Sequence, residues 1–330
     1  MKNQKVSQQQ VKSRPPKGWL FLFGISLLFV FTLSGCEAKD DQATPSGEET
    51  ILIEEPSEKK DESSSDELSS ENRESSDEKS SEEGSSVPED RSFTLVVQPG
   101  EYLIRILEDL CVSLNERGRE TEVPELLDLM DEIREEGDDL LFQKAEDLSM
   151  TAFSAEGYIA PGEYRFTGEE TDKEILLSLL SSWDQILAED VLTEIDDQDL
   201  SFHEILTAAS IIEFESSRTK DDTVKELVSS VIFNRLSSET PLQMDVTVFY
   251  LEEGLSPYRD PSDYESIYDT YEAEALPPGP ICSPSEASIL AAARPADTDY
   301  YFFIYDEEGN YYFASDYETH LENVETYLGD

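Results

Sequence analysis

A glutamate in an otherwise apolar helical stretch is the residue of this chain best suited to chemistry. Residues 206–236 read LTAASIIEFESSRTKDDTVKELVSSVIFNRL. At about 100° per residue, Glu213 falls on the same arc as Leu206 and Ala209. A carboxyl group partly removed from water resists ionisation, so its pKa is expected to rise toward about 6 to 7, which suits a general acid at neutral pH. Periodicity alone also allows a plainer interpretation, a half-exposed glutamate at the edge of an amphipathic helix.

A second acid follows two residues later. Glu215 lies about 200° further around a helix than Glu213, so the two side chains do not share a face. We expect a structural or supporting role for Glu215.

Two packed helices are expected to hold Glu213. Apolar residues flank it in the first helix, and in the second they recur every three or four positions from Val224 to Leu236. Asp221 or Asp222 is placed to cap the start of the second helix.

The region before these helices has the pattern of a small module. Residues 93–97 predict a strand, Pro99-Gly100 a turn, and residues 103–114 an amphipathic helix. The pattern further predicts a helix near residues 124–135, a loop or edge strand over residues 156–166, and a helix over residues 172–187.

Prolines mark the region after the central helices. Residues 276–281 contain three prolines, which fix backbone torsions and remove amide donors. Such a stiff loop suits the wall of a cleft, although it suits a plain turn equally well. Beyond it we predict a helix over residues 283–293 capped by Ser283, a β-hairpin of residues 300–305 and 311–314, and a closing helix over residues 317–327.

The chain starts like an exported protein. Basic residues precede an apolar run from Trp19 to Leu33, which ends in Leu33-Ser34-Gly35-Cys36. These four residues resemble a bacterial lipoprotein box, which implies cleavage before Cys36 and lipidation of its thiol. The alternative is an uncleaved membrane anchor, since the run is a little short of the roughly 20 residues that span a bilayer. Both interpretations place the remainder on the extracytoplasmic face of the cell membrane.

Composition separates a spacer from the folded part. Residues 37–91 are rich in Ser and Glu and poor in large apolar residues, which predicts a disordered, self-repelling linker. The whole chain has a formal net charge of -52, which argues against nucleic acid as a partner. Three cysteines are too few for a disulfide scaffold, and Cys111 and Cys282 are either buried thiols or a single bridge.

Several short motifs, in the same order along the chain, resemble the YceG-like family of endolytic murein transglycosylases. They are residues 209–215 around Glu213, residues 231–236, residues 242–245, Thr270-Tyr271, the loop of residues 276–281, and Pro295-Ala296. The resemblance runs from about Phe93 to Leu328. It departs at Val246, Asp269 and Ala275, where proline, asparagine and glycine are usual, and at the lipoprotein box, where a transmembrane helix is usual.

The resemblance implies a fold and an activity. The expected fold is α+β, with a LysM-like subdomain and connecting segment over residues 92–187 and a catalytic domain over residues 188–330, after the export signal of residues 1–36 and the linker. The implied reaction cleaves the β-1,4 bond between N-acetylmuramic acid and N-acetylglucosamine in peptidoglycan and leaves a 1,6-anhydro end. It needs no cofactor, and peptidoglycan synthases are the implied partners besides the glycan strands.

Individual residues have expected roles in such a reaction. Glu213 is expected to act as general acid and then as general base. The candidates for orienting sugar hydroxyl and acetamido groups are Asn234, Gln243, Asp245, Thr247 and Tyr271. For Gln243 and Asp245 the alternative is a hydrogen-bonded strand terminus. His203 and His320 are expected to be structural, and the sequence contains no visible metal cluster.

Two other functions fit the same residues. The first is a glycoside hydrolase in which Asp245 positions water or acts as nucleophile opposite Glu213. The second is a non-catalytic, surface-tethered module that binds wall polymer, which gives no reason for an acid in an apolar helix face.

Overall fold

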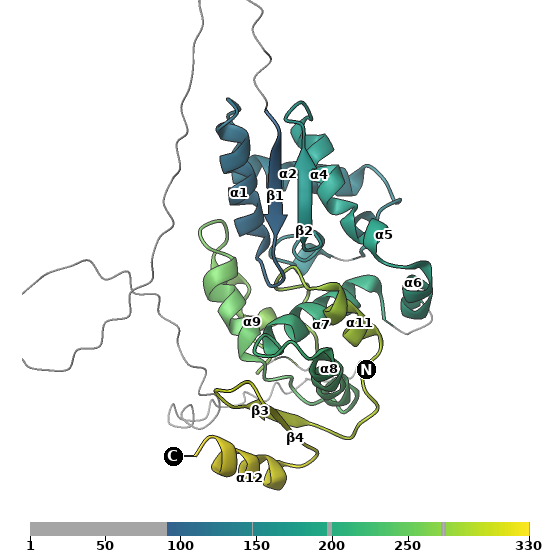
Figure 1. The fold of residues 1–330 in the computed structure, drawn as a ribbon, viewed down its shortest axis with the longest axis vertical. Helices are drawn as coiled ribbons and strands as arrows, with labels where there is room; N and C mark the ends of the chain where they lie inside the picture. Colours follow the sequence, from purple (N-terminus) through teal and green to yellow (C-terminus); the bar gives the residue numbers. More distant parts are fainter. Residues whose placement is uncertain (1–90, 147, 197–199, 272, 274, 330) are drawn as a thin grey trace, which may run out of the picture. The chain divides into compact units, whose positions relative to one another are not determined.

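The computed structural model describes residues 91–146, 148–196, 200–271, 273 and 275–329. The predicted signal with Cys36, and the predicted linker up to residue 90, lie outside the described residues. Two separate two-stranded sheets and many helices form the described part, so the mixed helix and sheet composition is confirmed (Figure 1). Within this part, none of the helices combines the length and the apolarity needed to span a bilayer.

The first part of the fold is a strand pair covered by helices. Strand β1 (Phe93–Val97) pairs antiparallel with β2 (Gly162–Phe166), and β1 alternates buried and exposed residues, as the two-residue period of a strand requires. The helices of this part are α1 (Leu103–Asn115), α2 (Val123–Glu135), α3 (Leu141–Lys144), α4 (Asp172–Leu180) and α5 (Ser182–Ile186), with the 3-10 turn η1 (Leu148–Met150). The predicted strand and first two helices are confirmed.

The helix predicted over residues 172–187 is interrupted. Ser181 has φ -84° and ψ 3°, which is not helical, and it separates α4 from α5. Its hydroxyl donates to the carbonyl of Ser178. Serine offers the backbone such local bonds in place of the helical ladder, which accounts for the break.

A buried glutamate joins the first part to the rest of the fold. Glu156 accepts the amide N–H of Leu103, at the start of α1, at 2.9 Å and the hydroxyl of Tyr250 at 3.1 Å. It is 1% exposed, and this burial raises the pKa of its carboxyl group to about 8. Glu156 therefore satisfies an amide at the start of α1 from inside the core.

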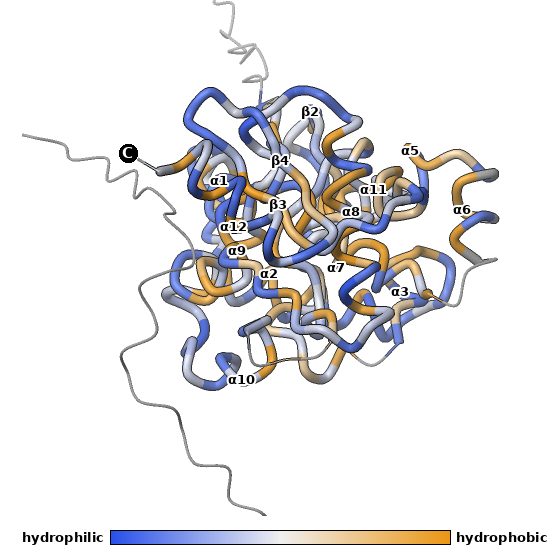
Figure 2. Tube along the Cα trace, turned by 90° about the horizontal axis from the view of Figure 1, so that it is seen from below, coloured by the Kyte–Doolittle hydropathy of each residue, from blue (hydrophilic) through white to orange (hydrophobic). Residues whose placement is uncertain are grey.

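Helices α7 (Phe202–Glu215), α8 (Asp222–Ser237) and α11 (Glu286–Ala293) form the centre of the fold, between the β1–β2 pair and the C-terminal hairpin (Figure 1). Helix α6 (Glu189–Asp196) packs on α7 and α11 from the edge of the molecule. Residues 205–212 of α7 are all buried, and Figure 2 draws this helix mainly in the hydrophobic colour. Helix α7 packs on both α8 and α11. Asp221 caps α8 by accepting the amide of Thr223, as predicted.

The capping residue predicted for α11 was wrong by two positions. Ser285, not Ser283, caps this helix and accepts the amide of Ser288. Ser283 cannot do so because its backbone bridges to Glu101, with which it pairs as in an antiparallel sheet.

The remaining elements surround this centre. They are α9 (Asp245–Phe249), the π-helical turn η2 (Tyr250–Gly254), the 3-10 turn η3 (Pro261–Asp263), α10 (Glu265–Tyr268), the hairpin strands β3 (Phe302–Tyr305) and β4 (Tyr311–Ala314), and α12 (Tyr317–Tyr327). The predicted hairpin and closing helix are confirmed. Asp245 begins a helix, so the strand-terminus alternative for it was wrong. Cys111 and Cys282 are buried free thiols, which rules out the bridge.

Candidate active site

Glu213 lies where three helices meet. It sits in the last turn of α7, facing Lys225 of α8 and the start of α11. Its Oε2 accepts hydrogen bonds from the Ser285 amide at 2.9 Å, the Ser285 hydroxyl at 2.5 Å and the Ser288 hydroxyl at 2.5 Å. No described residue donates to Oε1. One oxygen of the carboxylate is thus held rigidly, and the other is left for a ligand.

The predicted rise in the pKa of Glu213 was wrong. Burial is the largest single influence and raises the pKa. Hydrogen bonds from Ser285 and Ser288, together with the charge of Lys225, outweigh burial and bring the pKa below its ordinary value. The side chain is only 13% exposed, so the edge-of-helix interpretation does not describe it either. At neutral pH this carboxyl group is ionised.

Lys225 is the charge partner that the sequence interpretation missed. Its Nζ lies 3.1 Å from Glu213 Oε2 and 2.8 Å from the Ser288 hydroxyl. The start of α11 adds partial positive charge from its unpaired backbone amides. The sequence did contain a signal for this role. Lys225 lies one helical turn before Val228 on the second central helix, close to its apolar face, where a lysine has less access to water than on the polar face.

A second group of polar residues contains two of the predicted site residues, Asp245 and Tyr271. The hydroxyl of Tyr271 donates to Asp245 Oδ1 at 2.6 Å, and Tyr271 is 37% exposed, so its ring can meet a ligand. Burial, and then the charge of Asp245, raise the pKa of Glu215 to about 8. The charge of Glu215 in turn contributes to a raised pKa of Tyr271, after burial and the bond to Asp245. Glu215 thus belongs to this group, on a different face of α7 from Glu213.

Gln243 stands beside this group in a strained backbone conformation. Its φ is 56°, in the left-handed region that side chains rarely adopt. Its amide donates to the Thr270 carbonyl at 3.0 Å, and its side-chain oxygen accepts from Arg235 at 3.1 Å. The side chain is otherwise exposed, so its NH2 group is available to a ligand.

Arg235 is the residue that fixes this loop. It is 6% exposed, and it donates to the carbonyl oxygens of Tyr301, Pro241 and Leu242 as well as to Gln243. A buried guanidinium satisfied by several carbonyls holds the hairpin and the loop together. Arg235 belongs to the motif of residues 231–236, but its role in holding the hairpin and the loop together was not predicted from the sequence.

Two predicted binding residues serve the scaffold instead. Thr247 is fully buried, and its hydroxyl bonds to the Met244 carbonyl and to Thr270, so it does not reach a ligand. The amide nitrogen of Asn234 donates to the carbonyls of Thr298 and Tyr300. Both residues are therefore poor candidates for direct sugar contacts.

The two groups of residues are not directly bonded to each other. Among the described residues, no hydrogen bond joins Glu213 to Gln243, Asp245 or Tyr271. Asp269, where the resemblance leads us to expect asparagine, accepts the amide of Tyr271 at 2.9 Å. An asparagine oxygen could accept the same bond, so this departure leaves the local turn unchanged.

His203 lies in a structural position. His203 contacts the hydroxyl of Tyr158 at 2.9 Å and the carbonyl of Pro278 at 2.8 Å, which ties α7 to the loop of residues 276–281. The Ser210 hydroxyl accepts the amide of Ile281 at 3.0 Å and adds a second tie. In the described part of the chain, no group of three or more His, Cys, Asp and Glu side chains is arranged to hold a metal ion.

Comparison with known proteins decides the family. The model of the YceG-like family matches residues 71–326 of this chain. The chain belongs to the YceG-like family.

The names of similar proteins agree with this family assignment. A Bacillus subtilis protein named endolytic murein transglycosylase is 32% identical over 176 residues, which are 52% of this chain and 48% of that protein. A Streptococcus pneumoniae D39 protein of the same name is 31% identical over 180 residues, 52% of this chain and 32% of that protein. The chain thus spans half or less of the length of these curated relatives.

A solved structure shares the fold. The crystal structure of a YceG-like protein from Listeria monocytogenes has a TM-score of 0.58 and 28% sequence identity. The similarity covers 69% of this chain and 75% of the Listeria chain.

Proposed function

We propose that this YceG-like protein is an endolytic lytic transglycosylase that cleaves the bond between N-acetylmuramic acid and N-acetylglucosamine in peptidoglycan strands. Family membership and the names of the relatives support this activity. The observation that carries it is the state of Glu213, whose Oε2 is held by Ser285, Ser288 and Lys225 while Oε1 is left open.

In the proposed reaction Glu213 acts twice. Its Oε1 delivers a proton to the glycosidic oxygen while positive charge develops at the anomeric carbon. The 6-hydroxyl of the muramic acid then attacks that carbon, and the carboxylate removes the hydroxyl proton. No water enters, and the product carries a 1,6-anhydro ring.

In this scheme the protonation state of Glu213 changes when a glycan strand binds. Without substrate the carboxyl group is ionised, which suits the second step but not the first. A bound glycan excludes water from the exposed oxygen, and burial is already the largest influence on this pKa. Further desolvation therefore raises the pKa and allows the acid form to exist in the complex. The bonds to Oε2 keep the orientation constant through both steps.

In the proposed complex, the sugar is bound by the polar group around Tyr271 and Asp245 and by the neighbouring Gln243. The exposed face of Tyr271 stacks on a pyranose ring, while Gln243 and Asp245 bond to hydroxyl or acetamido groups. Asn234 and Thr247 support these residues from within the fold.

Replacement of Glu213 tests the activity. Glu213→Gln should lower the rate of release of anhydro-muramyl products from purified peptidoglycan by about 10² to 10⁴, the usual contribution of general acid–base catalysis. The matched control is Glu204→Gln, an exposed glutamate on the same helix, which should keep the wild-type rate. A folded Glu213→Gln protein that forms these products at the wild-type rate would refute the proposal.

A hydrolase is the second candidate, and one observation favours it. The charges of Asp245, Glu215 and Asp269 all act on Tyr271, so several carboxyl groups gather near the proposed sugar site. Asp245 could there position a water or act as nucleophile. Mass spectrometry of the products separates the two reactions, because hydrolysis adds a water to the muramic acid end and the transglycosylase reaction does not.

We further propose that the protein is held at the outer face of the cell membrane through its N-terminus, by lipidation at Cys36 or by an uncleaved anchor, and acts there near peptidoglycan synthases. The antiparallel pairing of β1 with β2, with α1, α2 and the short α3 and η1 between them in the chain, supports a LysM-like subdomain. Metabolic labelling with a fatty-acid analogue tests lipidation, and loss of the label in Cys36→Ser identifies the residue.

A further inference from the structure

The C-terminal helix α12 packs on both strands of the β3–β4 hairpin, and the hairpin lies between this helix and α8 (Figure 1). The ring of Phe302 on β3 contacts the rings of Tyr317 and His320 on α12. Ala314, which pairs with Phe302 across the hairpin, lies on the same side and is 2% exposed. A two-stranded hairpin depends on packing against such neighbours. Helix α12 therefore stabilises the hairpin.

His320 is buried between the helix and the hairpin. Of the residues of α12, all of which the structure describes, it alone is buried, with 8% of its surface exposed. Its ring stacks on Phe302 with centroids 5.0 Å apart, and its Nδ1 is buried without a hydrogen bond to any described group. In a neutral histidine one ring nitrogen carries a lone pair and no proton. A protonated ring would place an unpaired N–H at Nδ1 inside the protein, which costs free energy.

The charge that acts on His320 is positive. The guanidinium carbon of Arg235 on α8 lies 5.1 Å from the centre of the Phe302 ring, the ring on which His320 stacks. Burial, and then the charge of Arg235, lower the pKa of His320. Among the described residues no carboxylate forms an ion pair with His320, and Asp316 of its own helix is bonded to Thr319 instead. The surroundings therefore favour the neutral ring.

Tyrosines supply other ionisable groups on this side of the hairpin. The ring of Tyr317 lies 6.0 Å from the ring of His320. Tyr312 of β4 stacks on Tyr327 of α12, and its hydroxyl donates to Asp306 in the hairpin turn. The remaining acids of α12 are exposed to water; they are Glu318, Glu322 and Glu325.

Arg235 links the hairpin to the loop that carries a proposed sugar contact. Its Nε donates to the carbonyl of Tyr301, the neighbour of Phe302, at 2.7 Å. Its Nη1 donates to the Leu242 carbonyl at 2.9 Å and to the side-chain oxygen of Gln243 at 3.1 Å. Loss of α12 would uncover Phe302 and weaken the hairpin that holds Arg235 in this position.

We infer that His320 is a positioning residue: its neutral ring keeps α12 on the hairpin, and its protonation in acid releases the helix and loosens the loop that carries Gln243. A released helix takes up the proton at the ordinary histidine pKa of 6.5, whereas the packed helix takes it up only at lower pH. The packing of α12 is therefore strongest above about pH 6.5 and weakens as the pH falls below this value. The effect on the loop rests on the proposed function, whereas the release of α12 does not.

Hydrogen exchange of the full chain, measured by mass spectrometry at pH 7.5 and pH 5.5 and corrected for the intrinsic effect of pH, tests the release. At pH 5.5 the imidazole of a released helix is protonated about ten times more often than it is neutral, so exchange of the α12 amides should accelerate by up to about tenfold. His320→Phe keeps an aromatic ring against Phe302 but has no proton to gain, and its corrected exchange should be the same at both pH values.

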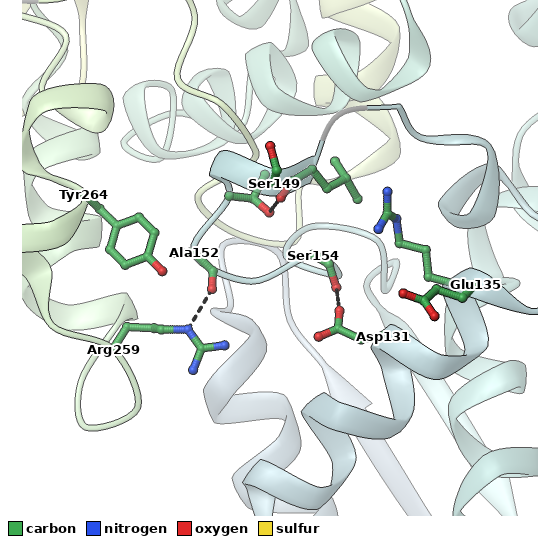
Figure 3. A pocket seen from close by; sticks show the side chains of 10 residues that line it. Asp131, Glu135, Ser149, Ala152, Ser154, Arg259 and Tyr264 are labelled. Atoms are coloured by element: carbon green, nitrogen blue, oxygen red, sulfur yellow. Dashed lines mark hydrogen bonds between the residues drawn. The ribbon is translucent and has the colours of Figure 1, made fainter.

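His203→Gln is the matched control, because the chain has two histidines and this one lies in another part of the fold. Its Nε2 contacts the Pro278 carbonyl at 2.8 Å. A Cβ atom added at the neighbouring Gly279 would lie 2.7 Å from Cγ2 of Thr151, which lines the pocket shown in Figure 3. The α12 amides of this variant should respond to pH as in wild type, and helix α4 serves as an internal reference that should not respond.

Contrary results overturn the inference. They are unchanged exchange of α12 in wild type, the same acceleration in His320→Phe, or its loss in His203→Gln. Acceleration throughout the chain, α4 included, would indicate acid unfolding of the whole fold and would overturn the inference as well. If His320→Phe does not fold, the uncharged His320→Gln decides.

Cleavage kinetics test the link to the loop. From pH 7.5 to pH 5.5, KM for glycan strands should rise by a larger factor in wild type than in His320→Phe, while kcat changes by the same factor in both. Equal KM profiles would overturn the link. A protein that releases α12 in acid but cleaves no peptidoglycan would refute the proposed function and leave the release established, so the two failures are distinguishable.

Discussion

The Nζ of Lys225 lies 3.1 Å from the Oε2 of Glu213, and the two side chains are 11% and 13% exposed. Together with the larger effect of the hydrogen bonds from Ser285 and Ser288, this nearly enclosed lysine holds the pKa of Glu213 below its ordinary value, against the effect of burial. Charge and orientation of the proposed catalytic group therefore depend on a lysine from the neighbouring helix.

Removal of this lysine should raise the pKa of Glu213. Since the positive charge favours the carboxylate, Lys225→Met should shift the titration of Glu213 to higher pH by about one unit, the lower end of the effect of a close opposite charge. A ¹³C NMR titration of the glutamate carboxyl groups measures it. Lys220→Met, at an exposed lysine before α8, is the control. Identical titrations of Glu213 in wild type and Lys225→Met would show that the pair has no such effect.

Glu215 should affect the pH profile more than the rate. Its pKa of about 8 means that it carries a proton at neutral pH, so the neutral Glu215→Gln variant should keep activity at pH 7 within about tenfold of wild type. Above pH 8 the wild-type carboxyl group ionises beside Asp245, whereas the variant cannot. Any loss of activity with an apparent pKa near 8 should therefore disappear in the variant.

The same variant tests the division of roles between the two glutamates. A loss as large as that of Glu213→Gln would assign the proton donor to Glu215 instead of Glu213. Rates measured on purified peptidoglycan from pH 5 to pH 9 distinguish these outcomes.

Glu156 should make the fold less stable at high pH. Its folded pKa of about 8 lies above its ordinary value of 4.5, so the folded state holds this proton more tightly than the unfolded state. The stabilisation is complete below about pH 4.5 and is lost as the pH rises through about 8. Glu156→Gln has no proton to lose and should be more stable than wild type at pH 9, by on the order of 2–4 kcal/mol.

Urea unfolding at pH 5 and pH 9 measures this difference. Near pH 5 the two proteins should have similar stability, because glutamine can accept the Leu103 amide as the protonated acid does. Glu163→Gln, at an exposed position of β2, is the control and should show the wild-type pH dependence. The same pH dependence in Glu156→Gln and wild type would contradict the assignment.

Gln243→Gly should separate stability from binding. Glycine adopts the left-handed φ of 56° without strain, but it loses the bond to Arg235, so the free energy of unfolding should change by less than about 1 kcal/mol. KM for glycan strands should rise because the exposed amide is gone.

Glu239→Gly is the matched control for this change. Glu239 has φ 54° and lies four residues before Gln243, so the substitution relieves similar strain. It should leave KM unchanged. A KM that rises equally in both variants would mean that the loop backbone, and not the Gln243 side chain, governs substrate binding.

Local patterns in the sequence predicted much of the fold. The strand of residues 93–97, the hairpin at Tyr305 and Tyr311, and the helices around Glu213 follow from apolar periods of two or about 3.6 residues. A period is a property of neighbours along the chain, so no tertiary information is needed to read it. Boundaries such as Ser181 and the cap of α11 were missed because they depend on local hydrogen bonds and on a distant bridge to Glu101.

The sequence by itself determined that an acid would lie in an apolar helix, and that the chain would resemble the YceG-like family. Only the tertiary structure decided the charge of that acid and the membership of the binding group. The pKa of Glu213 depends on donors 12 and 72 residues away in the chain, and the buried hydroxyl of Thr247 bonds to Thr270, 23 residues away. Such properties arise from groups that folding brings together, and no local pattern of residue types records which groups those are.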